Sequence, residues 1–337
     1  MTKLAESGRS AGAPENPFVI RPFAWDADLP ASVRLRNETD AVDQTDTATT
    51  EAEQRVRLTS PDHDPARDRW VVEEPGRPDR LIAEGVAWKG TNAPDAWLGL
   101  TVHPDWRRRG LGHALLPRLI ARAREQGAQY VTSGTNERVP AGPAFLQAHG
   151  FRPTTTWYDM QTPRHLDVSE PQVPQGYRIR PYSEVSDLDA LLVALNRGFI
   201  GHWGHHDETP EDIAHWLQAP ITRPDGIFLA FGPAGDVAGL SWNEINPERS
   251  ARRGVPTGYV DSLAVVPEHR RQGLGRALLL TGMRWMRDNG MEQYELGAWG
   301  ENEMALPLYF GVGYDVAQRG QEFRWDFPDS ALGDAKR

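Results

Sequence analysis

Hydrophobic residues follow two different spacings along the chain, one typical of helices and one typical of strands. Leucines between residues 188 and 195 recur every three or four positions, which predicts a helix. The apolar run 258–266 predicts a strand, and residues 274–285 return to the helical spacing before an Asn-Gly pair ends that helix. The predicted strand places four side chains on one face: Tyr259, Asp261, Leu263 and Val265.

The same succession of segments occurs twice. In each copy an apolar strand leads into helical segments, further strands, a glycine motif, a helix, a strand, a short helix and a final strand. Three pairs of similar segments occur in the same order, and the two members of each pair lie a nearly constant number of residues apart, which indicates an internal duplication. The echoed segments are FVIRPF (18–23) and YRIRPY (177–182), WRRRGLGHALL (106–116) and HRRQGLGRALL (269–279), and HGFRP (149–153) and VGYDV (312–316).

The duplication predicts two tandem α/β domains in the 337-residue chain, at residues 17–162 and 177–328. Residues 1–16 are rich in Ser, Gly, Ala and Pro and predict a disordered lead. The proline-rich stretch 163–176 predicts a linker between the two units.

Composition and charge argue against several classes of protein. The chain has no cysteine, which excludes disulfides, zinc–thiolate sites and any cysteine thioester intermediate. A net charge of −10 argues against a nucleic-acid partner. No long apolar run suggests a signal or a membrane span, so we expect a cytoplasmic protein without a membrane partner. The oligomeric state stays open.

The glycine motif joins the end of a strand to the start of a helix. Main-chain N–H groups near Gly273 therefore lie at the positive end of a helix dipole. Gly273 and Gly275 carry no Cβ, so a phosphate can approach the main chain. A turn with solvated arginines is the alternative, but the repetition in one context favours a pyrophosphate cradle. The motif is neither a Walker loop nor the dinucleotide fingerprint, because the required Lys or third glycine is missing.

These stretches resemble a known superfamily. VVPEHRRQGLGRALL (265–279) resembles the acetyl-coenzyme A motif of the GNAT N-acetyltransferases, and NEMALPLYFGVGY (302–314) is similar to their downstream element. The resemblance covers both units, and the duplicated layout is similar to that of tandem-domain actinobacterial acetyltransferases of the mycothiol synthase kind. It implies that each domain has a mixed, mostly antiparallel sheet flanked by helices.

The resemblance also implies an activity and a cofactor site. The implied reaction is direct transfer of acetyl from acetyl-CoA to a primary amine of a small molecule, with no acyl-enzyme and no metal. The pantetheine arm would lie like an extra strand along Leu263 and Val265. The implied cofactor-binding residues are Leu263, Val265, Arg270, Arg271, Gln272, Gly273, Leu274, Gly275, Arg276 and Asn302 in the second unit, and Val102, Arg107, Arg108, Arg109, Gly110, Leu111, Gly112 and His113 in the first.

Two residues of the second unit are candidates for proton transfer. The resemblance places the hydroxyl of Tyr309 near the thioester sulfur, as general acid, whereas without the motif a core aromatic would be the simpler interpretation. Asp261 interrupts an apolar strand and is the candidate base, because burying a carboxylate there is costly unless it is paired or has a catalytic role. Many relatives keep a carboxylate where this chain has Tyr259, and Glu244 is the reserve candidate.

The first unit keeps the glycine loop and lacks both candidates. Leu98 and Leu146 stand at the positions of Asp261 and Tyr309, and Val139 stands at that of Asn302. We expect the prolines in 139–151 to spoil the short helix there, and Pro117 falls inside the preceding helix. The first unit is therefore predicted to bind cofactor or to be structural, without catalysis.

Residues 198–216 contain four histidines and two tryptophans in the segment where the superfamily builds its acceptor pocket. We expect aromatic walls with polar groups for an amine. Two alternatives are a loop that caps the sheet, with Thr209 as N-cap and Pro210 at the first helical position, and a metal site. The residues of that metal site would be His202, His205, His206 and Asp207, whose spacing matches no strong zinc signature. At the level of function, the alternative to an enzyme is a non-enzymatic module that senses acetyl-CoA.

Overall fold

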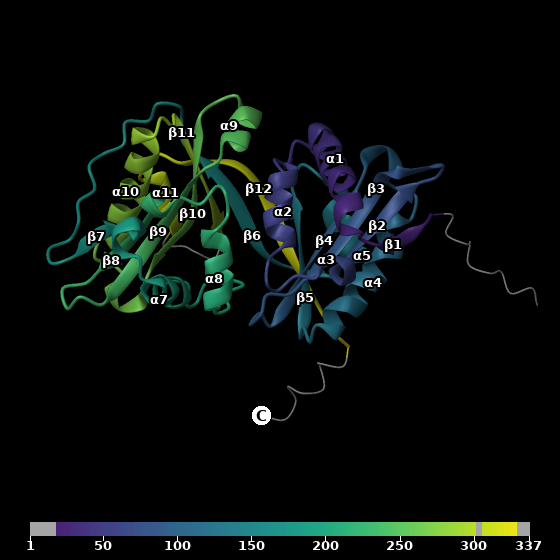
Figure 1. The fold of residues 1–337 in the computed structure, drawn as a ribbon, viewed down its shortest axis with the longest axis horizontal. Helices are drawn as coiled ribbons and strands as arrows, with labels where there is room; N and C mark the ends of the chain where they lie inside the picture. Colours follow the sequence, from purple (N-terminus) through teal and green to yellow (C-terminus); the bar gives the residue numbers. More distant parts are fainter. Residues whose placement is uncertain (1–17, 301–304, 329–337) are drawn as a thin grey trace, which may run out of the picture.

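The computed structural model describes residues 18–300 and 305–328. The predicted disordered lead 1–16 and the candidate residue Asn302 lie outside the described residues. Figure 1 shows two halves side by side, each with strands and flanking helices. Within the described part of the chain, no helix is both long and apolar enough to cross a lipid bilayer.

The first repeat follows the predicted order of elements. A short strand leads into three helices, three strands, a 3₁₀ turn at Pro104–Trp106, a long helix, a strand, a short helix and a last strand. These elements are β1 (Ile20–Pro22), α1 (Trp25–Asp43), α2 (Glu51–Leu58), α3 (Pro65–Asp68), β2 (Arg69–Glu74), β3 (Arg77–Trp88), β4 (Asp95–Val102), α4 (Leu111–Glu125), β5 (Tyr130–Asn136), α5 (Ala141–Ala148) and β6 (Arg152–Gln161).

The second repeat has the same order with an added helix before its third long strand. The helices expected at 188–195 and 274–285 are present, and the strand expected at 258–266 is present with both ends one residue earlier. The elements are β7 (Arg178–Pro181), α6 (Tyr182–Val185), α7 (Leu188–Gly198), α8 (Pro210–Leu217), β8 (Ile227–Phe231), β9 (Val237–Ile245), α9 (Pro247–Arg253), β10 (Thr257–Val265), α10 (Leu274–Asp288), β11 (Gln293–Trp299), α11 (Ala305–Phe310) and β12 (Asp315–Asp326).

One proline expectation was wrong. The segment after β5 forms the eight-residue helix α5 in spite of its two prolines. Pro140 is the N-cap and Pro143 lies in the first turn, where main-chain N–H groups have no partner within the helix and none is lost. Pro117 does lie inside α4, as expected, and the helix continues through it.

The strands form one sheet of twelve in the order β1-β2-β3-β4-β5-β12-β6-β11-β10-β9-β8-β7. Among the described strands, only the pairs β4–β5 and β10–β11 are parallel, so the predicted mixed, mostly antiparallel α/β fold is confirmed. The last strand of each repeat is exchanged: β12 pairs with β5 of the first repeat, and β6 pairs with β11 of the second. The two exchanged strands also pair with each other at the centre.

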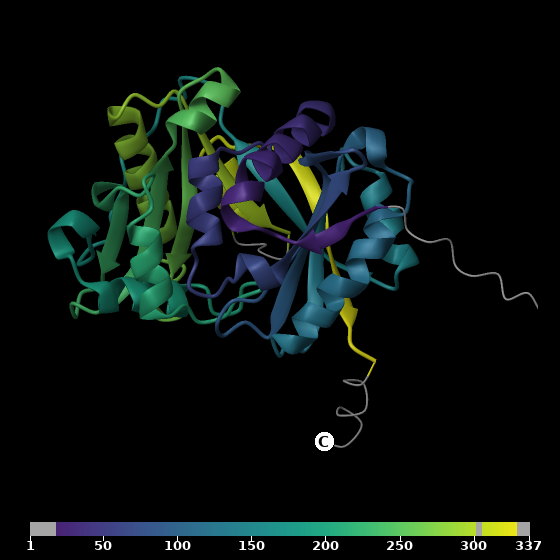
Figure 2. The same cartoon turned by 45° about the vertical axis from the view of Figure 1, so that its right-hand side comes forward.

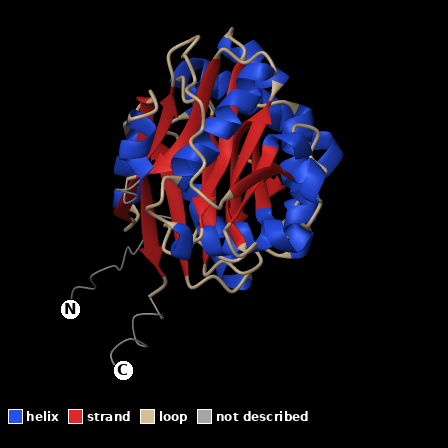
Figure 3. Ribbon diagram, turned by 90° about the vertical axis from the view of Figure 1, so that its left-hand side faces the viewer, coloured by secondary structure: helices blue, strands red, loops and turns tan. Residues whose placement is uncertain are grey.

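Helices cover the two faces of this sheet (Figure 3). Buried leucines of α4 and α10 pack on one face, as in the clusters that contain Leu119 and Leu279. On the other face α1 packs over the first repeat, and α7 with α8 packs over the second through Leu191 and Ile213. In the described chain, residues 162–177 between β6 and β7 form neither helix nor strand.

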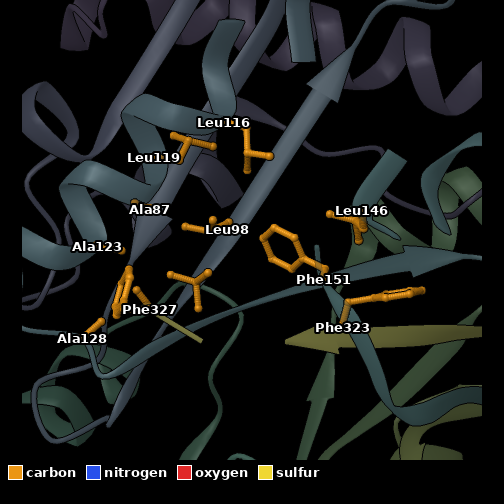
Figure 4. Packing of buried hydrophobic residues seen from close by; sticks show 12 residues of the cluster. Ala87, Leu98, Leu116, Leu119, Ala123, Ala128, Leu146, Phe151, Phe323 and Phe327 are labelled. Atoms are coloured by element: carbon orange, nitrogen blue, oxygen red, sulfur yellow. The ribbon is translucent and has the colours of Figure 1, made fainter. Parts of the chain in front are cut away.

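The strand exchange places each repeat's residues in the other repeat's core. Phe323 of β12 is 0% exposed and packs with Leu98, Leu119 and Phe151 of the first repeat (Figure 4). Met160 of β6, at the equivalent position of its own repeat, is 1% exposed in the core of the second. Neither half can therefore complete its core from its own repeat alone.

The buried exchange makes a prediction for stability. Phe323→Ala should lower the free energy of unfolding by about 3–5 kcal/mol, because it leaves a cavity in a closely packed core. Val316→Ala on the same strand, at a side chain 41% exposed, should change it by less than about 1 kcal/mol. Urea denaturation followed by tryptophan fluorescence measures both. Two separate transitions in Phe323→Ala, with the second half unaffected, would contradict the shared core.

Candidate active site

The two glycine loops have the same backbone conformation. Gly273 and Gly110 are the N-caps of α10 and α4, with φ of 85° and 84°. Two residues earlier, Arg271 and Arg108 also have positive φ, at 63° and 64°. This repeated left-handed conformation turns successive N–H groups toward one point, an arrangement that binds anions. The N–H groups of residues 271–276 and 108–113 have no hydrogen-bond acceptor among the described residues.

The first arginine of each motif holds the loop in place. The Nε atom of Arg270 donates to the main-chain oxygen of Val265 at 2.9 Å, and its Nη2 atom donates to the main-chain oxygen of Gly198 at 3.0 Å. Arg107 makes the equivalent bond to Val102 at 3.2 Å and pairs with Asp43 of α1. Both guanidinium groups carry positive charge beside the loop while their donors are engaged by the protein.

The space above the loops differs between the two halves. A Cβ on Gly275 would lie 3.7 Å from Leu308 Cδ2, an ordinary van der Waals separation. A Cβ on Gly112 would lie 3.0 Å from Phe145 Cε2, which is tighter than most real contacts. Phe145 stands at the position of Leu308 in the repeat. The aromatic ring thus crowds the cradle of the first half.

Strands β10 and β11 pair only at their beginning. Their last paired residues are Val260 and Leu296, after which β11 continues beside β6. On its other edge β10 stays paired with β9, and the Val266 N–H donates to Ala238 O at 2.9 Å. Because main-chain groups alternate between the two edges of a strand, those of Leu263 and Val265 face the gap. Strand β10 therefore has an unpaired edge at the position predicted for the pantetheine arm.

Asp261 is the extra residue of a β-bulge. The register of β10 against β9 shifts between Val260 and Ser262, so the face predicted for Asp261, together with Leu263 and Val265, was wrong. Tyr259 pairs with Glu244 on the face covered by α7 and α8, whereas Leu263 lies toward α10. Asp261 is exposed, and its carboxylate accepts from the Ser262 hydroxyl at 2.9 Å.

The first half has no such bulge. Strand β4 pairs with β3 without a register shift, and Leu98 lies opposite Ala87 in the core. When β4 and β10 are aligned through the residues that they pair with on neighbouring strands, Leu98 takes the position of Val260. Asp261 therefore has no counterpart at all in β4, and Trp88 stands where β9 has Glu244.

Glu244 and Asp261 form an acidic pair beside the gap. Burial and, next, the nearby Asp261 carboxylate raise the pKa of Glu244 to about 8, although Arg249 and Arg57 oppose the shift. Although the Asp261 side chain is exposed, desolvation by the surrounding protein atoms raises its pKa as well, and the hydrogen bond from Ser262 opposes that shift. Arg249 lies over the ring of Tyr259, 4.6 Å from its centroid. A carboxyl group whose pKa is raised toward neutrality can accept a proton from an ammonium group.

Tyr309 lies on the opposite side of the gap. It belongs to α11, is 7% exposed and packs in the core cluster with Leu279 and Val260. Its ring meets that of Tyr314 edge-on, with centroids 6.1 Å apart. Burial raises the pKa of Tyr309 to about 12, so the hydroxyl keeps its proton and stays a donor. The gap thus runs between a buried phenol on one face and carboxyl groups on the other.

The histidine-rich segment forms a pocket next to the acidic pair. Thr209 caps α8 through a capping box with Asp212, and Pro210 is the first helical residue, as predicted. The rings of Trp203 and Trp299 pack at a tilt of 33°, with centroids 4.6 Å apart. Among the described residues no group of three or more side chains could hold a metal ion. The cavity, of about 230 Å³, is lined by Leu195, Asn196, Phe199, His202, Trp203, Gly204, His205, His206, Glu208 and Ser262.

Sequence reasoning missed two charged residues that face this region. Glu208 lines the pocket, and burial, with smaller contributions from Asp212, Asp62 and Asp261, raises its pKa. Arg57 of α2 comes from the first repeat and lies near Glu244. Neither residue belongs to a motif, and only the docking of the two halves brings Asp62 and Arg57 to the site.

The fold and the motifs agree with known proteins. The model of the acetyltransferase (GNAT) family matches residues 34–151 and 188–314. A mycothiol acetyltransferase of Thermobispora bispora is 32% identical over 64% of this chain and 71% of its own length. Another, of Nocardiopsis dassonvillei, is 31% identical over 64% of this chain and 70% of its own length.

Solved structures with two such units have the same fold. A GCN5-related N-acetyltransferase from Sphaerobacter thermophilus superposes with a TM-score of 0.71 at 20% identity, over 93% of this chain and 96% of that one. A tandem GNAT protein from the clavulanic acid biosynthesis pathway gives a TM-score of 0.68 at 19% identity, over 92% and 98%. The chain therefore belongs to the GNAT family and is an N-acetyltransferase built from two tandem units, with an acyl-CoA as co-substrate.

Proposed function

We propose that the protein transfers acetyl from acetyl-CoA to a primary amine of a small molecule, and that the reaction takes place in the second half. The observation that carries this proposal is the bulge of β10. It adds one carboxylate at the gap between β10 and β11, where β4 of the first half has no corresponding residue. The remaining parts of the site are the cradle, the strand edge and Tyr309.

The cradle and the strand edge would orient the co-substrate. The unpaired N–H groups of residues 271–276 lie at the positive end of α10 and suit a pyrophosphate. Main-chain groups of Leu263 and Val265 would pair with the pantetheine amides, as an added strand does. The thioester carbonyl would then lie in the gap, between Tyr309 and the acidic pair.

The chemistry requires three proton movements. The Asp261 carboxylate, beside Glu244, takes one proton from the acceptor's ammonium group and frees its nitrogen lone pair. That lone pair forms the C–N bond to the thioester carbonyl carbon, the nitrogen releases its second proton to solvent, and the C–S bond breaks. The departing sulfur receives the hydroxyl proton of Tyr309, which is renewed from solvent. No covalent enzyme intermediate is needed, in agreement with a chain that contains no cysteine.

The first half would then support the reaction without performing it. It keeps the cradle conformation at Arg108 and Gly110, but Leu98 and Leu146 are buried apolar residues at 2% and 4% exposure. Neither leucine can move a proton. Phe145 additionally crowds Gly112.

Release of free thiol from acetyl-CoA in the presence of single amines tests the proposal. Because the protein has no cysteine, it adds no thiol of its own to the assay. The panel includes the precursor that mycothiol acetyltransferases use, since two of the relatives carry that name. Amine-dependent release supports the proposal. An acetyl-CoA sensor predicts binding of the thioester without release by any amine.

The role of Tyr309 can be separated from its packing. Tyr309→Phe removes only the hydroxyl, so the buried ring and its contact with Tyr314 remain. We expect kcat to fall by about 100-fold, the usual scale of lost proton transfer, with an unchanged melting temperature. Steady-state thiol release and thermal denaturation measure the two effects. A kcat within threefold of wild type would exclude the acid role.

The acidic pair predicts a pH dependence. A base must be ionised, and the ionised fraction of a carboxyl group with a raised pKa grows as the pH rises through that pKa. Because the pKa values of Glu244 and Asp261 are both raised, Glu244 to about 8, kcat/KM should increase with pH and level off above about pH 8.

Variants of the pair assign the base. Glu244→Gln removes a like charge from Asp261, so the rising limb should move to lower pH while most activity remains. Asp261→Asn should lose about 100-fold of kcat/KM at every pH. The reverse pattern, with Glu244→Gln inactive and Asp261→Asn active, would make Glu244 the base.

The two cradles offer a matched pair of substitutions. Gly273 and Gly110 have nearly the same φ and open space around them, so a new side chain is equally strained in both. Gly273→Glu places a negative charge in the cradle and should lower kcat/KM for acetyl-CoA about 100-fold. Gly110→Glu should lower it by less than about threefold, and the two alanine variants control for strain. Equal losses in both glutamate variants would contradict catalysis confined to the second half.

A further inference from the structure

Helix α2 of the first repeat docks against the second repeat. The main-chain oxygen of Val56 lies 3.0 Å from Nε2 of His215 in α8. One turn earlier, Oε1 of Glu53 accepts from Nδ2 of Asn246 at 2.6 Å, just beyond the end of β9. Figures 1 and 2 both show α2 on the side of the first half that faces the second. Glu244 precedes Asn246 by two residues, so α2 lies beside the acidic end of the site.

Arg57 of α2 is oriented toward this site. It follows Glu53 by four residues and therefore lies on the same face of the helix. Its side chain is exposed, and it has no hydrogen bond or ion pair with any residue that the structure describes. The charged groups around it are Arg36, Arg249, Glu53 and Glu244. An unpaired guanidinium thus lies at the interface between the two halves, near Glu244.

Four other arginines near this interface are paired. Arg249 binds Glu295 at 2.6 Å, Arg253 binds Asp46 at 2.7 Å, and Arg252 binds Glu53 at 3.4 Å. Arg36 of α1 is likewise paired, with Glu84. These pairs hold α9 and α1, whereas Arg57 is left with its five N–H donors available.

We propose that Arg57 binds a carboxylate of the acceptor while the acceptor's amine lies at Asp261. The acceptor would then be an amino acid or a short peptide, and the first repeat would select it. A single guanidinium matches a singly charged carboxylate in a two-bond arrangement. A phosphate would carry more charge than Arg57 balances, beside Glu244, Asp261 and Glu208. This inference rests on the proposed acetyl transfer in the second half.

The test compares amines that differ only in one charge. Dipeptides and their C-terminal amides have the same amino group and differ in one carboxylate. Phosphoethanolamine and ethanolamine are the corresponding pair for a phosphate. Thiol release from acetyl-CoA is measured with wild type, Arg57→Ala and Arg57→Lys. Arg55→Ala is the matched control, because Arg55 is exposed on the same helix and lies over Trp25, away from the interface.

Wild type should prefer the free carboxylate over the amide by at least about tenfold in kcat/KM, the scale of a charge-assisted pair. Arg57→Ala should abolish this preference through a higher KM for the acid, with kcat, the KM for acetyl-CoA and the rate with the amide unchanged. Arg57→Lys should restore part of the preference. Arg55→Ala should behave as wild type.

Other outcomes overturn the inference in distinguishable ways. Equal use of acids and amides, or a loss of kcat with both in Arg57→Ala, would mean that Arg57 does not select the acceptor. If Arg57→Ala shifted only the rising part of the pH profile of kcat/KM, Arg57 would act only through the effect of its charge on Glu244. A preference for phosphoethanolamine over the dipeptides would replace carboxylate by phosphate as the recognised group. No thiol release with any amine, wild type included, would refute the proposed function itself.

Discussion

The pairing of the two exchanged strands at the centre of the sheet is the constraint on which the other features depend. Strand β12 lies between β5 and β6, and β6 lies between β12 and β11. Main-chain hydrogen bonds therefore run without interruption from one repeat into the other, and Phe323 and Met160 complete cores that are not their own. Two repeats that could have been separate domains become one sheet. This fixes the contact between α2 and α8, and with it the approach of first-repeat residues to Glu244.

Within this frame the two halves differ by small changes with large chemical consequences. The cradles are alike in φ and in their unpaired N–H groups, so phosphate binding alone does not separate them. One inserted residue in β10 does, because a bulge turns a carboxylate toward the acceptor face while the strand remains paired on its other edge. In β4 the ladder is regular, and Leu98, the counterpart of Val260, packs in the core under α4. On the proposed function, the duplicated fold keeps its glycine loop twice and carries out its chemistry once.

The sequence alone predicted the elements and the family well, and the details of the site less well. Helical and alternating spacings located α7, α10 and β10, since those patterns reflect burial on one face. The bulge was not foreseen, because one extra residue leaves the apolar pattern nearly intact. The only sign of it in the sequence is that the number of residues between equivalent positions of the two repeats changes along the chain. The strand exchange leaves no local pattern in the sequence, since the residues of β6 and β12 would suit pairing within their own repeat as well as with the other repeat. Arg57 carries no motif, and its place follows only from how α2 docks.

A structure with a bisubstrate amide tests the central claim most directly. The ligand would join coenzyme A, through an acetyl link, to the amine that gives the fastest thiol release. We expect this ligand to occupy the gap between β10 and β11, with the amide nitrogen within hydrogen-bond distance of Asp261 or Glu244 and the sulfur beside the Tyr309 hydroxyl. Occupancy of the gap between β4 and β5 alone, or an acceptor portion turned away from both carboxyl groups, would contradict it.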